Sequence, residues 1–241
     1  MQKVYHDMNE VCVKTAEWFV AEANKAIAKQ GKFTVALSGG ATPRQLFMEL
    51  AKAEWQKQMD WSKVIVFWGD ERFVAPTDAQ SNQKMARETL LDHVPIAKKN
   101  IIPVPFLATA ELSAKQYEVE LKQIFSDLPQ FDLILLGLGA DGHTASLFPG
   151  SRALKEKIRW VCPSQPKTGG PERITLTYPV INNGALVCFL VTGAEKAAIV
   201  KEILEATPGS EEYPAQRIQP TSGNLMWMLD RAAASALKRG Y

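Results

Sequence analysis

Short apolar runs alternate along this chain with longer stretches whose apolar residues recur at helical spacing. The apolar runs lie at 33–37, 64–68, 131–136, 173–177 and 185–191. Continuous runs of this length are typical of strands buried on both faces of a parallel sheet. Helical spacing occurs at 8–29, near 82–91 and at about 111–125, and a further helix is expected to carry Lys196. The alternation predicts β-α-β crossovers and an α/β fold, a three-layer α/β/α sandwich around a mostly parallel sheet.

The composition is consistent with one globular domain spanning residues 1–241. Of these residues 46% are apolar and 22% are charged, which is sufficient for a sizeable core. The formal charge is +2 and no dense basic block occurs, so we expect no nucleic-acid partner. No apolar run approaches the roughly 20 residues of a membrane helix and the N-terminus has no apolar export segment, so we expect a cytoplasmic protein without a membrane partner.

The cysteines and histidines do not form a recognisable metal motif. Cys12, Cys162 and Cys188 are far apart and lie in or beside apolar segments. The three histidines do not cluster with them at zinc-ligand spacing. We therefore expect free, packed thiols and no structural metal.

A polar loop directly follows the apolar run 131–136 and carries the main candidates for chemistry. It places Asp141 and His143 between glycines, including Gly139 and Gly142. Open parallel sheets bind ligands beyond the carboxyl ends of their strands, so both side chains are expected in a crevice. Imidazole titrates near neutral pH, which makes His143 a candidate general base that Asp141 orients. The alternative is a histidine that only fixes its own loop.

A second candidate loop follows the run 33–37 and contains Ser38, Gly39, Gly40 and Thr42. Thr42 is expected to cap the next helix, whose N-terminal N–H groups favour phosphate or carboxylate. The alternative is a tight turn without a ligand. The loop lacks the glycine spacing of a dinucleotide site and the Gly-Lys-Ser/Thr end of a P-loop, so we expect neither a nicotinamide cofactor nor ATP.

Three basic residues could complete an anion site. Arg72 follows the run 64–68 in a polar loop and could meet a substrate oxyanion or hold Asp141. Arg173 begins one predicted strand, and Lys196 lies just beyond the end of another, where it could bind a phosphate. Each could instead be an ordinary solvated side chain. Residues 163–171, rich in Pro, Gly and polar residues, are expected to form a surface loop that could cover the crevice.

Four ordered blocks make the sequence resemble the 6-phosphogluconolactonase family over nearly the whole chain. The blocks are Ser-Gly-Gly-Ala-Thr-Pro at 38–43, Trp-Gly-Asp-Glu-Arg at 68–72, Gly-Leu-Gly-Ala-Asp-Gly-His-Thr-Ala-Ser-Leu-Phe-Pro at 137–149 and Thr-Gly-Ala-Glu-Lys at 192–196. The resemblance implies hydrolysis of 6-phospho-D-glucono-1,5-lactone to 6-phosphogluconate, the second step of the oxidative pentose phosphate pathway, at a metal-free site. It also implies a fold similar to that of glucosamine-6-phosphate deaminase. The expected partner is the small sugar-phosphate lactone, and the expected assembly is a monomer or small homo-oligomer.

Two alternatives remain at the level of sequence. The deaminases of the same superfamily share the Asp-Gly-His core but continue with Phe-Asn-Glu-Pro, where this chain has Leu-Phe-Pro-Gly at 147–150. The missing glutamate weakens the deaminase reading. A non-catalytic sugar-phosphate sensor on the same scaffold is weakened by the presence of Asp141, His143 and Arg72.

Overall fold

The fold is built around a parallel sheet with six strands in the order β1-β9-β8-β5-β2-β3. The computed structural model describes residues 1–167, 169–207 and 212–238. In sheet order the strands are β1 (Gln2–Tyr5), β9 (Asn224–Asp230), β8 (Leu186–Val191), β5 (Leu133–Leu136), β2 (Phe33–Leu37) and β3 (Val64–Trp68). All five strand pairs are parallel, so their carboxyl ends lie along one edge. The predicted parallel sheet is confirmed, with the edge strand β1 and its neighbour β9 as two strands that the sequence did not predict.

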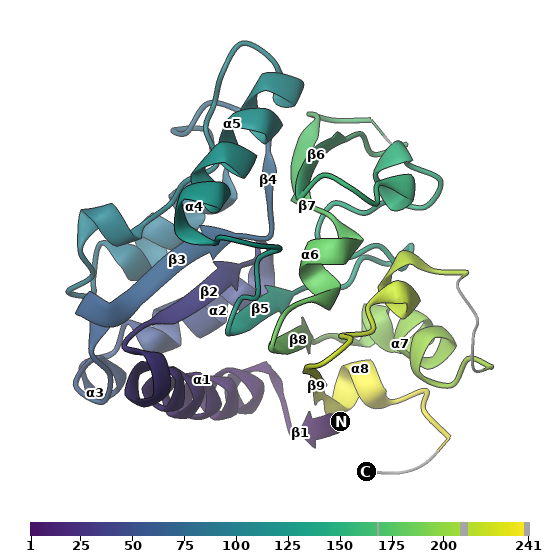
Figure 1. Ribbon diagram of the computed structural model, residues 1–241. Helices are drawn as coiled ribbons and strands as arrows, with labels where there is room; N and C mark the ends of the chain where they lie inside the picture. The colour runs from purple at the N-terminus through teal and green to yellow at the C-terminus, as the bar shows by residue number, and fades with distance from the viewer. Residues whose placement is uncertain (168, 208–211, 239–241) are drawn as a thin grey trace.

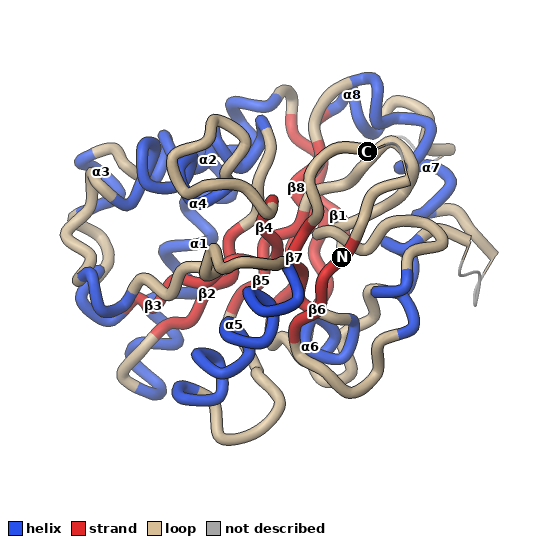
Figure 2. Tube along the Cα trace, turned by 90° about the horizontal axis from the view of Figure 1, so that it is seen from above, coloured by secondary structure: helices blue, strands red, loops and turns tan. Residues whose placement is uncertain are grey.

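Helices cover both faces of this sheet, as the predicted three layers require (Figures 1 and 2). Below the sheet in Figure 1 lie α1 (Met8–Gln30) and α2 (Ala41–Leu50), and above it lie α5 (Ala110–Ile124) and α6 (Tyr178–Asn182). The remaining α-helices are α3 (Ala53–Gln56), α4 (Asn82–Ala86), α7 (Ala197–Leu204) and α8 (Arg231–Ala234). A π-helical turn continues α4 over Arg87–Leu91, and 3-10 turns lie at Trp61–Lys63, Lys98–Asn100, Arg152–Lys155, Ala194–Lys196 and Pro214–Arg217. No helix in the described part of the chain is long and apolar enough to cross a bilayer.

The longest helix, α1, shows how local sequence sets an element. Asp7 caps its N-terminus by accepting a hydrogen bond of 2.9 Å from the Glu10 N–H. Gly31 ends it in the left-handed conformation with φ 78° and donates to the Ile27 carbonyl. Between these caps, one face of the helix is buried against the sheet. The predicted helix 8–29 is therefore confirmed with a one-residue extension.

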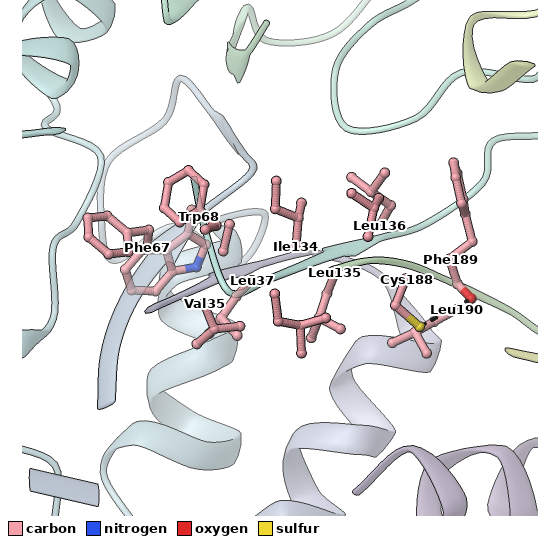
Figure 3. Close-up of a cluster of buried hydrophobic side chains, with 14 of the residues drawn as sticks. Val35, Leu37, Phe67, Trp68, Ile134, Leu135, Leu136, Cys188, Phe189 and Leu190 are labelled. Carbon is pink, nitrogen blue, oxygen red and sulfur yellow. Dashed lines mark hydrogen bonds between the residues drawn. The ribbon is translucent and has the colours of Figure 1, made fainter. Parts of the chain in front are cut away.

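The central strands are apolar on both sides because both faces of the sheet are covered. Ile134, Leu136 and Phe189 extend to one face, and Val35 and Leu135 extend to the other, as Figure 3 shows. The side chains of all five are at most 1% exposed. The continuous apolar runs in the sequence follow from this double burial.

A second, antiparallel sheet of three strands lies above the first in Figure 1 and corrects two sequence predictions. Its order is β4 (Asp70–Arg72), β7 (Arg173–Leu176) and β6 (Val161–Ser164). Residues 69–72 were expected in a loop and 173–177 in the parallel sheet, and both expectations are wrong. A three-residue charged strand has no apolar periodicity, and an apolar run does not specify which sheet it joins.

Candidate active site

A cleft of about 770 Å³ opens at the carboxyl ends of the parallel strands, next to the small sheet. Its wall contains residues that follow β2, β3, β5 and β8. Eight of the residues singled out from the sequence border it: Ser38, Gly39, Gly40, Thr42, Arg72, His143, Arg173 and Lys196. The ninth, Asp141, contacts the ring of His143 from the same loop. Residues separated by more than 150 positions along the chain therefore share one site, as expected for a ligand at the switch point of an open sheet.

His143 is held through one ring nitrogen. Its Nδ1 lies 2.5 Å from Oδ1 of Asp141, and its ring stacks at an angle on Phe148, with centroids 4.7 Å apart. A carboxylate at Nδ1 favours the tautomer that carries the proton there. Within the described chain Nε2 has no hydrogen-bond partner, and the His143 side chain is 30% exposed. The arrangement leaves a basic nitrogen available to the cleft.

Two glycines make this geometry possible. A Cβ at Gly139 would lie 2.0 Å from Nδ1 of His143, so only glycine lets the ring lie over the backbone here. Gly142 has φ 74°, and a Cβ there would lie 2.5 Å from the ring of Tyr213. The 139–143 turn is closed by a hydrogen bond of 2.8 Å from the Gly139 N–H to the His143 carbonyl. The loop therefore presents the Asp141 and His143 side chains from a fixed backbone.

The charge of the pair is set by the same contact. Burial acts to raise the pKa of Asp141, but the hydrogen bond and the charge of His143 outweigh burial and lower this pKa below its usual value. Asp141 is thus an anion at neutral pH. An anion at Nδ1 stabilises the protonated form of the ring after it accepts a proton.

The loop after β2 places a free helix N-terminus in the cleft. α2 begins at Ala41 after Gly40, which has φ 105°, and no side chain in the described part of the chain caps this end. Thr42 was expected to be the cap, and this expectation is wrong because Thr42 lies inside the helix. Its hydroxyl instead lies 2.7 Å from that of Thr192 in the loop after β8. The uncapped N–H groups are suited to an anion.

Two arginines of the small sheet face each other across β4 and β7. Arg72 and Arg173 are register partners, and both border the cleft. Burial and the nearby charge of Arg72 lower the pKa of Arg173. Each guanidinium donates 2.5 Å hydrogen bonds to backbone carbonyls, Arg72 to Gln80 and Arg173 to Pro171. No described carboxylate lies within ion-pair distance of either, and Arg72 does not hold Asp141. The charges of Asp70 and Glu71 act to raise the pKa of Arg173, but burial and the charge of Arg72 outweigh them, so the pair is an electropositive site.

Lys196 borders the cleft from the turn that follows β8. It ends the 3-10 turn that follows β8, and Gly193 opens this turn with φ 102°. The Gly193 N–H donates to both carboxylate oxygens of Asp230 at 3.1 Å. Asp230 also accepts from the Ala233 N–H and thereby caps the N-terminus of α8. Lys196 thus stands on a turn anchored to β9.

Several cleft residues were not found from the sequence. They are Asp70, Asn82, Ser146, Thr192 and Glu195. Asp70 and Ser146 belong to the motif blocks quoted above, but nothing local shows that Ser146 donates to Asp70 at 2.6 Å. Asn82 donates to the Asp70 carbonyl from a different part of the chain. Only the tertiary contacts identify these residues.

The segment 163–171 is only partly the loop that was expected. Pro163 and Ser164 belong to β6, while Pro166 and Gly169 border the cleft. Residue 168 lies outside the described residues. Whether the segment closes over a ligand stays a prediction. Among the described side chains, no group of three or more His, Cys, Asp or Glu residues is arranged to hold a metal ion.

Comparison with known proteins shows the family to which this chain belongs. The family model for glucosamine-6-phosphate isomerases/6-phosphogluconolactonase matches residues 6–227. A 6-phosphogluconolactonase of Synechocystis sp. is 45% identical over 233 residues, covering 95% of this chain and 92% of that protein. The solved 6-phosphogluconolactonase from Trypanosoma cruzi has a TM-score of 0.87 at 30% identity, covering 99% of this chain and 97% of that one. A monomeric glucosamine-6-phosphate deaminase shares the fold, with a TM-score of 0.81 at 19% identity over 98% of this chain and 99% of its own. This chain belongs to the glucosamine-6-phosphate isomerase/6-phosphogluconolactonase family.

Proposed function

We propose that this protein hydrolyses 6-phospho-D-glucono-1,5-lactone to 6-phosphogluconate, the lactonase step of the oxidative pentose phosphate pathway. The observation that carries the proposal is the position of His143. Its Nδ1 is bound to Asp141 and its Nε2 has no hydrogen-bond partner among the described residues, in the same cleft as the Arg72–Arg173 pair and the α2 N-terminus. A base and an anion site in one cleft suit a phosphorylated substrate with a hydrolysable carbonyl. The 45% identity to a named lactonase over 95% of the chain supports the same reaction.

The chemistry requires little beyond a base and charge stabilisation. Nε2 of His143 takes a proton from water while the water oxygen attacks the lactone carbonyl carbon. The carbonyl oxygen becomes an oxyanion, which Arg72 or nearby backbone N–H groups stabilise. The C–O bond of the ring then breaks, and the imidazolium returns its proton to the leaving ring oxygen. Asp141 holds the ring and stabilises its charged form throughout, and no covalent intermediate is needed.

In this proposal, binding of the substrate phosphate sets the distance between the lactone carbonyl carbon and the His143 ring. The uncapped N-terminus of α2 with Ser38, Gly39, Gly40 and Thr42 supplies N–H and hydroxyl donors. Arg173 of β7 and Lys196 of the turn after β8 supply positive charge. Holding the remote end of the substrate converts binding energy into orientation at the carbonyl.

The test is a parallel assay on two substrates. Freshly generated 6-phosphogluconolactone is followed by acid release, and glucosamine 6-phosphate is followed by ammonia release, with spontaneous lactone hydrolysis subtracted. Enzyme-dependent acid release with no ammonia supports the proposal. Ammonia release would favour a deaminase, and tight binding of 6-phosphogluconate without turnover would favour a sensor, and either result overturns the proposal.

A further inference from the structure

The buried carboxylate of Asp70 has no assigned task in the mechanism above, although it borders the cleft. Asp70 is only 8% exposed. Its Oδ2 accepts a hydrogen bond of 2.6 Å from the Ser146 hydroxyl. Its Oδ1 has no hydrogen-bond partner among the described residues, and it is not one of the unpartnered polar atoms that are sealed from solvent. A buried acid with one anchored and one open oxygen is prepared to accept a hydrogen bond from a ligand.

The pleat of β4 determines where this carboxylate lies. Side chains two residues apart leave the same face of a strand, so Asp70 accompanies Arg72 on the cleft side. Glu71 lies between them and extends to the opposite side, where it accepts from the Asn82 and Gln83 N–H groups at the start of α4. The Asp70 and Arg72 positions are separated along the strand by about 7 Å. Asp70 is therefore the next residue along β4 on the same face as Arg72, two positions before the arginine pair.

The partner of Asp70 connects it to the loop of the proposed base. Ser146 follows His143 by three residues and is 1% exposed, and its N–H donates a hydrogen bond of 3.3 Å to the Thr175 hydroxyl of β7. The chain turns sharply between them at Ala145, whose φ is 46°. Asp70 thus lies between the arginine pair on one side and the His143 loop on the other. A phosphorylated sugar in contact with both groups would lie beside the Asp70 carboxylate.

We propose that Asp70 is a specificity residue that accepts a hydrogen bond from a ring hydroxyl of the sugar-phosphate lactone through Oδ1. This inference rests on the proposed function and adds the recognition of the sugar between the phosphate and the carbonyl. A hydroxyl donor suits the site because the carboxylate is desolvated and has no ion-pair partner within the described chain. A site built to bind a hydroxyl discriminates strongly against the analogue that lacks it, because the buried acceptor is then left unpaired.

The experiment compares kcat/KM for the parent lactone and for its 2-deoxy, 3-deoxy and 4-deoxy analogues, all carrying the phosphate. For wild type, we expect one analogue to lose about 10- to 100-fold in kcat/KM, the value of a hydrogen bond to a charged group. Asp70→Asn should lower kcat/KM for the parent lactone by a similar factor. For the analogue that wild type discriminates against, Asp70→Asn should lower kcat/KM little further. The variant and the analogue remove the same hydrogen bond, so their effects on kcat/KM should not add.

The matched control is Glu71→Gln, which removes a buried carboxylate from the neighbouring position on the opposite face of β4. It should change kcat/KM by the same factor for the parent and all three analogues. The proposal is overturned if Asp70→Asn lowers kcat/KM equally for all four substrates, or leaves the parent unaffected. It is also overturned if wild type does not distinguish any deoxy analogue, a result that does not depend on the folding of a variant.

The hydroxyl contact of Asp70 can be tested even if the proposed lactonase function fails. If wild type does not hydrolyse the parent lactone, binding of 6-phosphogluconate and its 2-deoxy, 3-deoxy and 4-deoxy forms by calorimetry replaces turnover. Loss of discrimination in Asp70→Asn would then still support the hydroxyl contact. Equal affinities of wild type for all four compounds would overturn it.

Discussion

Arg72 and Arg173 occupy directly opposed positions in the antiparallel pair of β4 and β7, with both residues bordering the cleft. Like charges that face each other across two strands destabilise a sheet by a few tenths to about 1 kcal/mol. The fold keeps this pair without a described carboxylate within ion-pair distance of either residue. An anionic ligand would relieve the repulsion, so ligand binding and the stability of the small sheet should be coupled.

This coupling predicts that Arg173→Met unfolds at the same or a slightly higher temperature than wild type without ligand, because one of two opposed charges is gone. The rise in Tm that 6-phosphogluconate produces should be much smaller in the variant. Thermal unfolding with and without the ligand measures both effects. Arg159→Met is the control, since Arg159 pairs with Glu111 and Glu156 outside the cleft. An undiminished ligand-induced shift in Arg173→Met would remove Arg173 from the anion site.

His143→Ala should lower kcat on the lactone by a factor of about 10² to 10⁴, the usual contribution of a general base. The affinity for 6-phosphogluconate should stay nearly unchanged, because the phosphate contacts remain. Initial rates and product inhibition separate the two. His93→Ala serves as control, because the His93 ring bonds the Glu88 carbonyl away from the cleft. Near-normal kcat in His143→Ala would exclude the ring as the base.

Asp141→Asn tests whether the negative charge of Asp141 supports His143 as the base. The lowered pKa of Asp141 means that its stabilising contact is present above about pH 3.8, the ordinary value, and is lost as pH falls through the lower folded-state pKa. Asp141 is therefore an anion at neutral pH, where it faces Nδ1 of His143. In Asp141→Asn a ring that has accepted a proton from water has no anionic partner, so kcat measured at neutral pH should fall. A wild-type kcat in Asp141→Asn would contradict this role.

The central strands and the helices between them were predictable because their signals are local. The apolar run before Gly137 and the glycines around His143 identify a buried strand and the loop that follows it, and both are present as expected. The same reasoning could not assign β4, because three charged residues become a strand only through pairing with β7, about 100 positions later. Sheet pairing depends on register between distant segments, which no short window contains.

The candidate site shows the same limit at the level of single residues. Positive groups could be named from the sequence, but the opposition of Arg72 and Arg173 follows only from the β4–β7 register. Thr42 looked like a helix cap because it precedes a proline, yet the helix begins one residue earlier. Asp70 stood in a quoted motif and still received no role, since its partner Ser146 lies 76 positions away.

Lys196→Ala should mainly raise KM for 6-phosphogluconolactone, because a phosphate contact is made equally in the ground and transition states. Unphosphorylated gluconolactone should be hydrolysed equally well by variant and wild type. Steady-state kinetics on both lactones gives the comparison. Lys201→Ala is a suitable control, since Lys201 lies on α7 and does not border the cleft. If both lactones were affected alike, the assignment of Lys196 to the phosphate would be wrong.

Glu71→Gln should destabilise the fold by about 1–3 kcal/mol per unpaired group, because the four groups that bond Glu71 are all donors. Oε1 accepts from the Arg72 and Asn82 N–H groups, and Oε2 accepts from the Ser81 hydroxyl and the Gln83 N–H. Burial raises the pKa of Glu71, and these bonds act against burial. A glutamine has to direct its NH₂ at one pair of donors, so urea unfolding should show a lower midpoint than wild type. Glu88→Gln, an exposed acid, should unfold like wild type. An unchanged midpoint in Glu71→Gln would mean that the β4–α4 junction tolerates an unpaired donor.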